Sequence, residues 1–388
     1  MARFALHGGL GRGRVNWMGE HRPPADPLPT FPPVRDHILR FLAAPLAALF
    51  GIGVEARLLL YRTGVLKRTS FSLPTIGVGN LSVGGAGKTP HTEYLVRLLR
   101  DYFPVATLSR GYGRKTSGFR YVEPTHRAED VGDEPLQLKR KFPDLAVAVG
   151  EDRVFGVSTL LQYAPQTQAV ILDDVFQHLA VRPALTLLLT EYDRPYWRDS
   201  LMPVGRLREW ATGAERADAI VVTKCPQVLA QADRSRLLEE LDALPHQRVF
   251  FSRYGYGAPW FVLDPRYTTA LSPEYDVLLV TAIARVDYLL EYLRGEVAEV
   301  HEVSFRDHHD FSKRDLGRVA RLFREIDNPR KLILTTEKDA MRLYAHEEFL
   351  RREDLPLFAL PALVQFLPEA PGRGFDEYVR HRLLEFRA

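Results

Sequence analysis

Cysteine is almost absent from this sequence, and no apolar run is long. The 388 residues include a single cysteine, Cys225, which excludes an internal disulfide framework and predicts a reducing, cytoplasmic compartment. The longest apolar stretch, residues 41–54, contains Pro45 and two glycines and is shorter than the roughly 18 residues that a spanning helix needs. Residues 1–34 hold no contiguous apolar core of a secretory signal, and we expect them to form a flexible extension.

A large excess of charge of either sign is also missing. Lys and Arg number 52 against 49 Asp and Glu, which gives a formal net charge of +3. This small basic excess suits an anionic substrate or an anionic membrane surface, but it is too small to indicate a nucleic-acid-binding protein. Hydrophobic residues at 46% and charged residues at 26% are typical of a soluble globular protein with room for two or three domains.

Basic residues flank the apolar stretch 41–54 on both sides. They are Arg35, His37 and Arg40 before it, and Arg57, Arg62, Lys67 and Arg68 after it. An apolar helix with basic flanks can lie in the headgroup region of an anionic leaflet, where each cation contributes about 1 kcal/mol. A helix packed on a sheet, with its arginines solvated, explains the same pattern, and the residues alone leave both interpretations open.

From residue 74 onward, short runs rich in β-branched residues alternate with helical patterns. The runs are 75–78, 105–108, 145–149, 169–172, 185–189, 219–223, 277–280 and 332–335, and the helical stretches include 92–100, 153–163, 230–241 and 313–324. Strands buried on both faces with helices between them predict an α/β fold with a doubly wound, mostly parallel sheet. Residues 248–265, rich in aromatic side chains, are expected to be extended and to join two α/β parts.

A glycine-rich loop follows the run 75–78 and leads into a helical pattern. The loop reads Ser82-Val83-Gly84-Gly85-Ala86-Gly87-Lys88-Thr89. Glycines let backbone N–H groups turn toward phosphate oxygens, and the N-terminus of the helix adds a favourable dipole. We expect Lys88 to bridge the β- and γ-phosphates of ATP and the Thr89 hydroxyl to bind Mg²⁺. Ser82 stands where the strict pattern has glycine, so the match is to the variant Gly-Gly-x-Gly-Lys-Thr form.

Two carboxylates follow the buried run 169–172. Asp173 and Asp174 are expected at the carboxyl edge of the sheet, where P-loop proteins place the acid that binds Mg²⁺. Successive side chains of a strand point to opposite faces, so we expect only one of the two to contact the ion directly. The residues do not indicate which one, and the alternative is that the pair caps the next turn.

Several motifs, taken in order, resemble the tetraacyldisaccharide 4′-kinase family of lipid A biosynthesis over roughly residues 40 to 345. They are Gly79-Asn80-Leu81-Ser82-Val83-Gly84-Gly85-Ala86-Gly87-Lys88-Thr89-Pro90, Ser109-Arg110-Gly111-Tyr112-Gly113-Arg114, Gly132-Asp133-Glu134-Pro135, Asp173-Asp174-Val175-Phe176-Gln177-His178, Gly205-Arg206-Leu207-Arg208-Glu209, Asp307-His308 and Thr336-Glu337-Lys338-Asp339-Ala340. Each motif alone is weak, whereas the ordered set is highly specific. The chain departs from the family by Val175, where glycine is usual, and by its long N-terminal extension.

The resemblance implies transfer of the γ-phosphoryl group of ATP, with Mg²⁺, to the 4′-hydroxyl of a tetraacylated glucosamine disaccharide 1-phosphate. It implies that the reaction takes place at the cytoplasmic face of the inner membrane of a Gram-negative-type bacterium, with residues 35–70 docked in the membrane. It also implies a P-loop kinase core at residues 71–250 and a smaller α/β domain at 251–388 that closes over the nucleotide. The lipid acceptor and the membrane surface are the expected partners, without nucleic acid or an obligate protein partner.

A sugar hydroxyl is a poor nucleophile, so a positioned base must accept its proton during attack on phosphorus. By resemblance this base is Asp133, paired with His308, which would orient the carboxylate and share the proton. Without the family, Asp133 would be interpreted as a loop-capping aspartate and His308 as a surface histidine. His309 is the rival of His308, and the family pattern, with a histidine directly after the aspartate, favours His308. Lys88 is the third predicted catalytic residue.

Other motif residues have expected roles beside this centre. Glu209 would assist Mg²⁺ through water and Arg208 would neutralise phosphate charge, with an ordinary solvated ion pair as the alternative. Gln177 is expected to line the same cleft. Arg110 and Arg114, set among glycines after a strand, are the expected partners of the substrate 1-phosphate.

The alternative function is a nucleotide-switched P-loop ATPase of the partitioning or metallochaperone type. Such proteins share the Gly-Gly-x-Gly-Lys-Thr loop and a parallel sheet, but they usually carry a lysine before the two glycines, where this chain has Val83. They also frequently contain Cys/His metal clusters, which a chain with one cysteine does not supply. These two differences favour the kinase.

Overall fold

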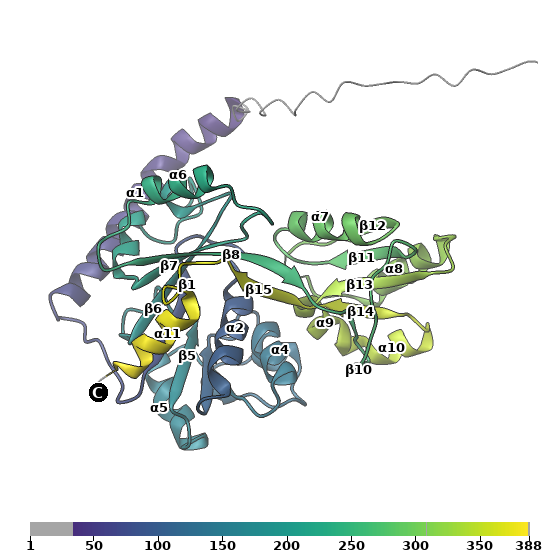
Figure 1. Cartoon of the computed structure of the whole chain (residues 1–388), viewed down its shortest axis with the longest axis horizontal. Helices are drawn as coiled ribbons and strands as arrows, with labels where there is room; N and C mark the ends of the chain where they lie inside the picture. Colours follow the sequence, from purple (N-terminus) through teal and green to yellow (C-terminus); the bar gives the residue numbers. More distant parts are fainter. Residues whose placement is uncertain (1–33, 308, 387–388) are drawn as a thin grey trace, which may run out of the picture. The chain divides into compact units, whose positions relative to one another are not determined.

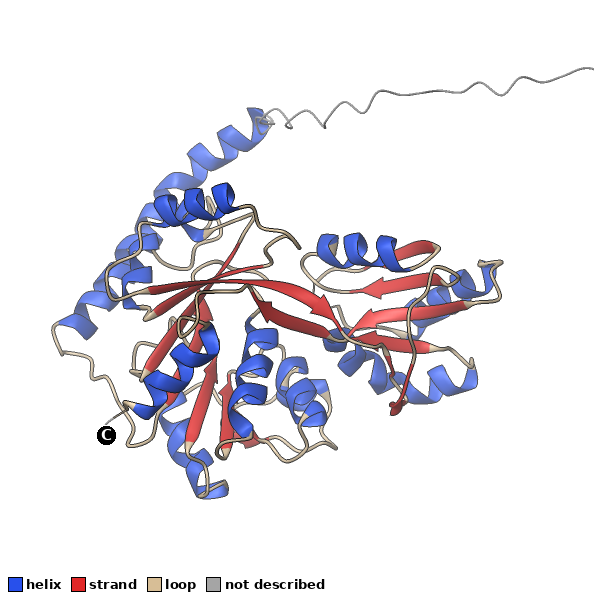
Figure 2. Cartoon of the chain, viewed as in Figure 1, coloured by secondary structure: helices blue, strands red, loops and turns tan. Residues whose placement is uncertain are grey.

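The computed structural model describes residues 34–307 and 309–386, with side chains from residue 43 onward. The predicted extension, apart from Val34, and the predicted catalytic His308 lie outside the described residues. The chain divides into two compact units between Ala43 and Ala44, and every contact reported below lies within the second unit. Figure 1 traces the chain and Figure 2 its secondary structure.

A nine-stranded sheet forms the larger part of the second unit. Its strand order is β15-β8-β7-β6-β1-β5-β2-β4-β3. The inner neighbours from β8 to β4 pair in parallel, and the two edge pairs, β15 with β8 and β3 with β4, are antiparallel. The strands are β1 (Thr75–Asn80), β2 (Val105–Ser109), β3 (Arg120–Tyr121), β4 (Ala146–Val149), β5 (Ala169–Asp173), β6 (Leu185–Glu191), β7 (Ala219–Thr223), β8 (Arg248–Tyr256) and β15 (Ala362–Phe366).

Helices cover both faces of this sheet (Figure 2). Leu95 of α2 packs with Ile76 of β1 in one apolar cluster, whereas Leu160 of α5 packs with Leu108 of β2 in a separate cluster. Two cores divided by one parallel sheet are what the near-continuous apolar runs of the strands predict. The helices are α2 (Lys88–Arg100), α3 (Ala128–Val131), α4 (Asp133–Lys141), α5 (Arg153–Tyr163), α6 (Gln231–Leu241) and α11 (Phe375–Leu384), with 3₁₀ turns η1 (Tyr196–Arg198) and η2 (Ala211–Arg216).

A second, six-stranded sheet has the order β10-β9-β14-β13-β11-β12. Strands β12, β11, β13 and β14 are parallel, and β9 and β10 are added antiparallel. The strands are β9 (Trp260–Phe261), β10 (Asp264–Thr268), β11 (Asp276–Thr281), β12 (Glu299–Ser304), β13 (Lys331–Thr336) and β14 (Leu357–Leu360). The helices are α7 (Asp287–Glu296), α8 (Lys313–Glu325), α9 (Glu337–Leu343) and α10 (Glu347–Arg352), with the 3₁₀ turn η3 (Tyr344–His346).

Two antiparallel strands connect the sheets. The chain leaves the larger sheet along β8 and returns along β15, and residues 252–256 pair with residues 362–366 (Figure 1). The predicted extended segment 248–265 is this exit, followed by β9 and the start of β10. Because β15 and α11 return to it, the larger sheet takes segments from both sides of the predicted boundary at residue 250.

The apolar stretch near the N-terminus is part of a longer helix than predicted. α1 (Val34–Arg62) has 29 residues, and its segment Ala43–Arg62 is long and apolar enough to cross a membrane by length and composition. The helix is longer than the predicted apolar stretch 41–54, because it continues past the charged residues Glu55 and Arg57.

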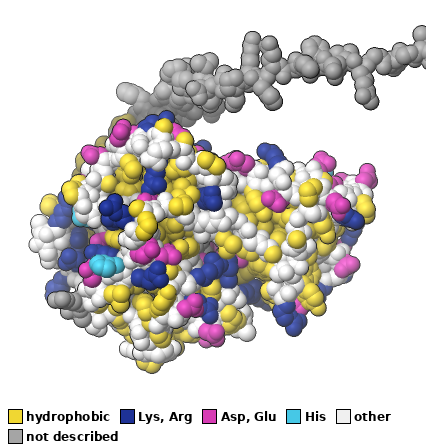
Figure 3. Space-filling view, viewed as in Figure 1, with side chains coloured by type: hydrophobic (Ala, Val, Ile, Leu, Met, Phe, Trp, Pro, Cys, Tyr) yellow, Lys and Arg dark blue, Asp and Glu magenta, His cyan; other side chains and the backbone are white. Residues whose placement is uncertain are grey.

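One face of this helix packs against the protein. Ala47 and Leu58 are buried, and Gly51 lies so close to Trp210 that a side chain would not fit. The opposite face is apolar and open, since Leu49 is 66% and Ile52 65% exposed. Over the rest of the visible surface, basic and acidic side chains are mixed (Figure 3), as the small net charge predicts.

Candidate phosphate-transfer site

The glycine-rich loop lies between the end of β1 at Asn80 and the start of α2 at Lys88. Gly87 precedes the helix with φ of +89° and Gly84 has φ of +122°, conformations that side-chain-bearing residues rarely adopt. No side chain of the described residues caps the first turn of α2, so its N–H groups are left to face a ligand. The Val83 N–H donates to the Arg206 carbonyl at 2.7 Å, which ties the loop to its neighbour.

Lys88 is held above this loop by two partners. Its Nζ donates to Asn80 Oδ1 at 3.1 Å and lies 3.5 Å from Asp174 Oδ1. Asn80 in turn donates from Nδ2 to the Ser82 carbonyl. The predicted phosphate-binding lysine therefore stands between the loop and the acidic end of β5.

The acidic pair occupies two different environments. Asp173 ends β5 and is buried; burial, and then the nearby Glu134, raise its pKa to about 7. Asp174 has φ of +50° and is partly buried; its burial acts to raise the pKa, but Lys88 and Arg208 outweigh that effect and lower the pKa.

A divalent cation fits this arrangement. Asp173 forms no ion pair with any described residue, and a buried carboxylate in that condition is stabilised by added positive charge. Thr89 is buried on the first turn of α2. A threonine hydroxyl and carboxylate oxygens are the ligands that Mg²⁺ prefers.

Gln177, Arg208 and Glu209 form a hydrogen-bonded network beside this centre. Arg208 Nη1 donates to Asp174 Oδ1 at 3.1 Å and to Gln177 Oε1 at 3.2 Å. Gln177 Nε2 donates to Glu209 Oε1 at 2.9 Å and to the Asn80 carbonyl at 3.0 Å. Both carboxylate oxygens of Glu209 are engaged, because Arg216 Nη2 donates to Oε2 at 2.8 Å. An Arg208–Glu209 ion pair, the alternative interpretation, does not form.

Asp133 begins α4 and is 4% exposed. Its Oδ2 accepts two hydrogen bonds from Arg342 of α9, and its Oδ1 accepts the Glu134 N–H at 3.0 Å. Glu134 pairs with Lys338 at 3.3 Å and is near enough to Asp173 to raise the pKa of that carboxyl. The first turn of α4 therefore lies close to the acidic end of β5.

The predicted substrate arginines differ in their surroundings. Arg110, directly after β2, is exposed. Arg114 is turned inward, where it donates to the Gly118 carbonyl at 2.7 Å and pairs with Glu151. Arg153, at the start of α5, was not predicted: it is buried, and its Nε and Nη2 have no partner among the described residues.

The pKa of Arg153 depends on the other charges of the site. Burial lowers this pKa to about 10, although the negative charges of Asp174 and Asp173 act to raise it. A signal was present in the sequence, because Arg153 follows the strand 145–149 by four residues and so belongs to the carboxyl edge of the sheet.

Sequence analysis also missed a layer of side chains behind the phosphate loop. His91 Nδ1 is 2.7 Å from the Gly87 carbonyl, so Nδ1 carries the proton, and Nε2 accepts from the Ser252 hydroxyl at 3.0 Å. The Tyr254 hydroxyl lies where a Cβ on Gly87 would stand. Ser252 and Tyr254 belong to β8, far away in sequence, and no local pattern indicates these contacts.

Comparison with known proteins places the chain among enzymes of one kind. The family model described as tetraacyldisaccharide-1-P 4′-kinase matches residues 39–380. The tetraacyldisaccharide 4′-kinase of Bacteroides fragilis is 42% identical over 342 residues, covering 86% of this chain and 91% of the relative. That of Flavobacterium johnsoniae is 42% identical over 307 residues, covering 79% and 88%.

A solved structure supports the same assignment. The crystal structure of LpxK from Aquifex aeolicus in complex with ATP superposes with a TM-score of 0.68 at 27% identity, covering 89% of this chain and 99% of that one. The resemblance read from the motifs and the predicted α/β fold are both confirmed, and the nucleotide switch is not favoured. The chain belongs to the tetraacyldisaccharide-1-phosphate 4′-kinase family.

Proposed function

We propose that this protein transfers the γ-phosphoryl group of ATP to the 4′-hydroxyl of a tetraacylated disaccharide 1-phosphate. The observation that carries the proposal is the position of Lys88, held by Asn80 and Asp174 above a glycine-rich loop in a member of this family. Such a cradle binds the polyphosphate of a nucleotide, and the acids beside it suit the accompanying Mg²⁺.

The loop residues 82–89 would hold the nucleotide phosphates through their N–H groups, with Lys88 at the γ-phosphate. Thr89 and Asp173 or Asp174 would hold Mg²⁺, which neutralises charge that develops on the transferred group. Glu209 is fixed by Gln177 and Arg216, so its expected contribution to the ion is indirect, through that network.

Asp133 would accept the proton of the attacking hydroxyl. A carboxylate that must meet an incoming alcohol needs a fixed orientation, and Arg342 supplies it through two N–H groups on one oxygen. Oδ1 accepts the Glu134 N–H, and it is the oxygen we assign to the proton transfer because Arg342 holds Oδ2. His308, from the motif, stays the predicted partner of this carboxylate.

Cations around the acids would bind the acceptor and stabilise the transition state. Arg208 already contacts Asp174, so it lies within reach of charge that develops next to the metal. Arg110 and Arg153 are near one another, and the unpartnered N–H groups of Arg153 suit an anionic oxygen of the acceptor. Arg114, already paired with Glu151, would support the loop that carries Arg110.

The open apolar face of α1 would rest on a membrane that holds the lipid acceptor. Exposed Leu and Ile side chains gain about 25 cal/mol for each Å² of apolar surface that leaves water. We place the reaction at the cytoplasmic face of the inner membrane, where ATP and a membrane-bound acceptor meet.

The test is incubation of the full chain in detergent with γ-labelled ATP, Mg²⁺ and the disaccharide 1-phosphate, followed by location of the new phosphate. We expect label on the 4′-oxygen and no labelled lipid when Mg²⁺ is chelated. Release of labelled phosphate at the same rate with and without the lipid would contradict the proposal.

A further inference from the structure

A cavity of about 700 Å³ opens beside the start of strands β1, β6 and β7 and extends along the loop after β5. Its lining includes Thr75, where β1 begins, Thr186 near the start of β6, and Asp218, which directly precedes β7. The loop leaves the other end of β1, which is six residues long. At about 3.3 Å per residue the start of β1 lies roughly 17 Å from the phosphate loop. The lining also includes Val175, Phe176 and His178, which follow the acidic pair, so the cavity reaches from the start of the strands toward the residues beside the nucleotide cradle.

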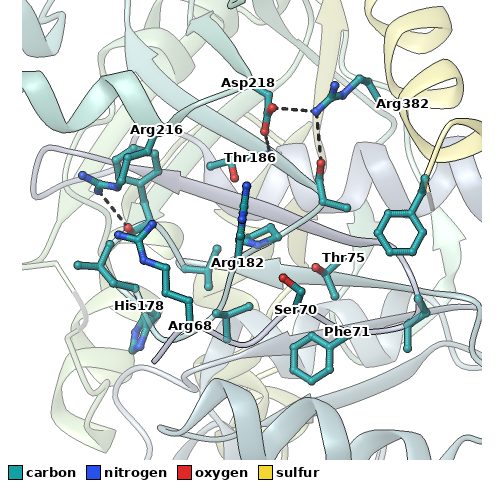
Figure 4. Close-up of a pocket in the computed structure, with 18 residues that line it drawn as sticks. Arg68, Ser70, Phe71, Thr75, His178, Arg182, Thr186, Arg216, Asp218 and Arg382 are labelled. Carbon is teal, nitrogen blue, oxygen red and sulfur yellow. Dashed lines mark hydrogen bonds and ion pairs between the residues drawn. The ribbon is translucent and has the colours of Figure 1, made fainter. Parts of the chain in front are cut away.

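Four arginines line this cavity: Arg68, Arg182, Arg216 and Arg382 (Figure 4). Asp218 is the one carboxylate in the lining, and it is already engaged by Arg382 at 2.8 Å and by the Thr186 N–H at 2.8 Å. Arg216 is engaged by Glu209 outside the cavity. Positive charge in the lining therefore exceeds the negative charge available to balance it.

Arg68 and Arg182 carry this excess, since neither forms an ion pair with any described residue. Arg68 is partly buried, which lowers its pKa. The nearby positive charges of Arg216 and Arg182 lower this pKa further, so the three guanidinium groups lie close together. Grouped guanidinium groups repel one another, and a bound anion offsets that repulsion.

The remaining lining identifies the kind of anion. Guanidinium groups match phosphate oxygens with two parallel N–H bonds, and the Ser70 and Thr75 hydroxyls add further donors. Phe71, Leu179 and Phe386 form an apolar part of the wall. Arg68 also follows the C-terminal end of α1 by six residues, and the exposed Val65 and Leu66 lie three and two positions before it.

We propose that this arginine cavity is a second anion site, which binds a phosphate group carried by the headgroup of an anionic phospholipid beside α1. The same chemistry would bind free phosphate, but the apolar wall and the adjoining apolar helix favour the lipid. The site does not depend on the kinase assignment, because none of Arg68, Arg182 and Arg382 contacts the nucleotide cradle.

The test measures phosphate binding by calorimetry on the full chain in detergent at constant ionic strength, with the phosphate loop filled by a non-hydrolysable ATP analogue. We expect Arg182→Gln and Arg68→Gln each to weaken binding about tenfold, the effect of one charged hydrogen bond. Both side chains are exposed, so these variants should fold. Arg321→Gln on α8, an exposed arginine far from the cavity in sequence, is the matched control and should bind like the wild type.

A second arm uses monomeric dihexanoyl phosphatidylglycerol in place of phosphate. Tighter binding than phosphate, lost in Arg182→Gln, supports the lipid headgroup, whereas equal affinity assigns the site to free phosphate. The proposal is overturned if the wild type binds neither ligand up to tens of millimolar, or if both bind Arg182→Gln as well as the wild type.

Discussion

Arg342 donates two hydrogen bonds to a single oxygen of Asp133, from Nε at 3.0 Å and from Nη2 at 2.6 Å. Arg342 belongs to α9 beside the smaller sheet, and Asp133 begins α4 beside the larger one. Both side chains are less than one-tenth exposed. The proposed base is thus oriented by the part of the protein that does not carry the phosphate loop.

Replacing the proposed base should stop chemistry but not nucleotide binding. We expect Asp133→Asn to lower kcat by about 10²–10⁴-fold, the usual contribution of a general base, with KM for ATP within a factor of about three. Steady-state kinetics with the lipid acceptor and calorimetric titration with ATP measure the two effects. Glu129→Gln, which removes an exposed carboxylate on α3, is the control and should leave both unchanged. An Asp133→Asn enzyme with wild-type kcat would remove Asp133 from the mechanism.

Replacing the positioning arginine should affect stability and kcat together. Arg342→Gln leaves the Asp133 carboxylate buried without its cation, and breaking such a pair costs about 3–5 kcal/mol of unfolding free energy. Arg342→Lys should recover part of that stability but little of kcat, because one ammonium group does not reproduce two fixed N–H directions. Denaturant unfolding and kinetics on both variants test this, together with the Asp133→Asn/Arg342→Gln double variant. Additive effects on kcat would show that the two residues act independently.

Crowding at Gly87 should make the phosphate loop intolerant of a single methyl group. Gly87→Ala combines a left-handed backbone, which costs about 1–2 kcal/mol for an L-residue, with a clash against the Tyr254 hydroxyl. We expect KM for ATP to rise at least tenfold. Tyr254→Phe should recover part of this loss in the Gly87→Ala background, and no recovery would mean that the hydroxyl is not the cause. Gly372→Ala, with φ of +74° in open space, is the control for backbone strain alone.

His91 should make the fold sensitive to mild acid. Burial lowers the pKa of His91 to about 4, compared with 6.5 for a free histidine. Between pH 4 and pH 6.5 the histidine is therefore protonated in the unfolded chain but neutral in the folded chain. The unfolding free energy should therefore fall as pH drops from 6.5 to about 4, by about 3 kcal/mol in total from this residue, and should not change above 6.5 on its account.

Urea unfolding across that pH range, on wild type and His91→Gln, measures the contribution. The pH dependence of His91→Gln should be shallower than that of the wild type below pH 6.5, and parallel curves would disprove the assignment. His246→Gln, at an exposed histidine, should follow the wild-type curve.

Lys141 joins the helices of the two sheets through two acids. Its Nζ lies 2.7 Å from Glu93 of α2 and 2.7 Å from Glu337 of α9, both buried. Burial, and then Glu93, raise the pKa of Glu337, so the lysine separates two carboxylates that repel each other. We expect Lys141→Gln to lower the unfolding free energy by about 3 kcal/mol or more. Lys115→Gln, in an exposed pair with Glu129, should cost less than about 1 kcal/mol. Equal losses would show that the buried network adds nothing.

Much of the larger sheet could be predicted because its evidence is local. The apolar run 169–172 and the acids after it coincide with β5 and its carboxyl end, and the helical pattern 153–163 coincides with α5. Helix α1 was underestimated for the opposite reason, since two charged residues interrupted a run that the helix simply continues through.

The partners within the site could not be predicted, because each joins strands or helices that are distant in sequence. Arg208 was expected to neutralise phosphate charge, with an ion pair to its neighbour Glu209 as the alternative. It contacts Asp174, 34 positions away. Arg114 stays a predicted partner of a substrate phosphate, and its ion pair with Glu151 was not foreseen. Both outcomes depend on which loops emerge side by side at one sheet edge.

By itself, the sequence determined the phosphate loop, the alternation of strands and helices, and the family, because these depend on glycine conformations, apolar periodicity and ordered motifs along the chain. Only the tertiary structure decided that Arg342 holds Asp133, that β8 supports Gly87 through His91 and Tyr254, and that four arginines share a cavity. The physical reason is that charge pairing and burial depend on distances through space, and Asp133 and Arg342 are 209 positions apart along the chain.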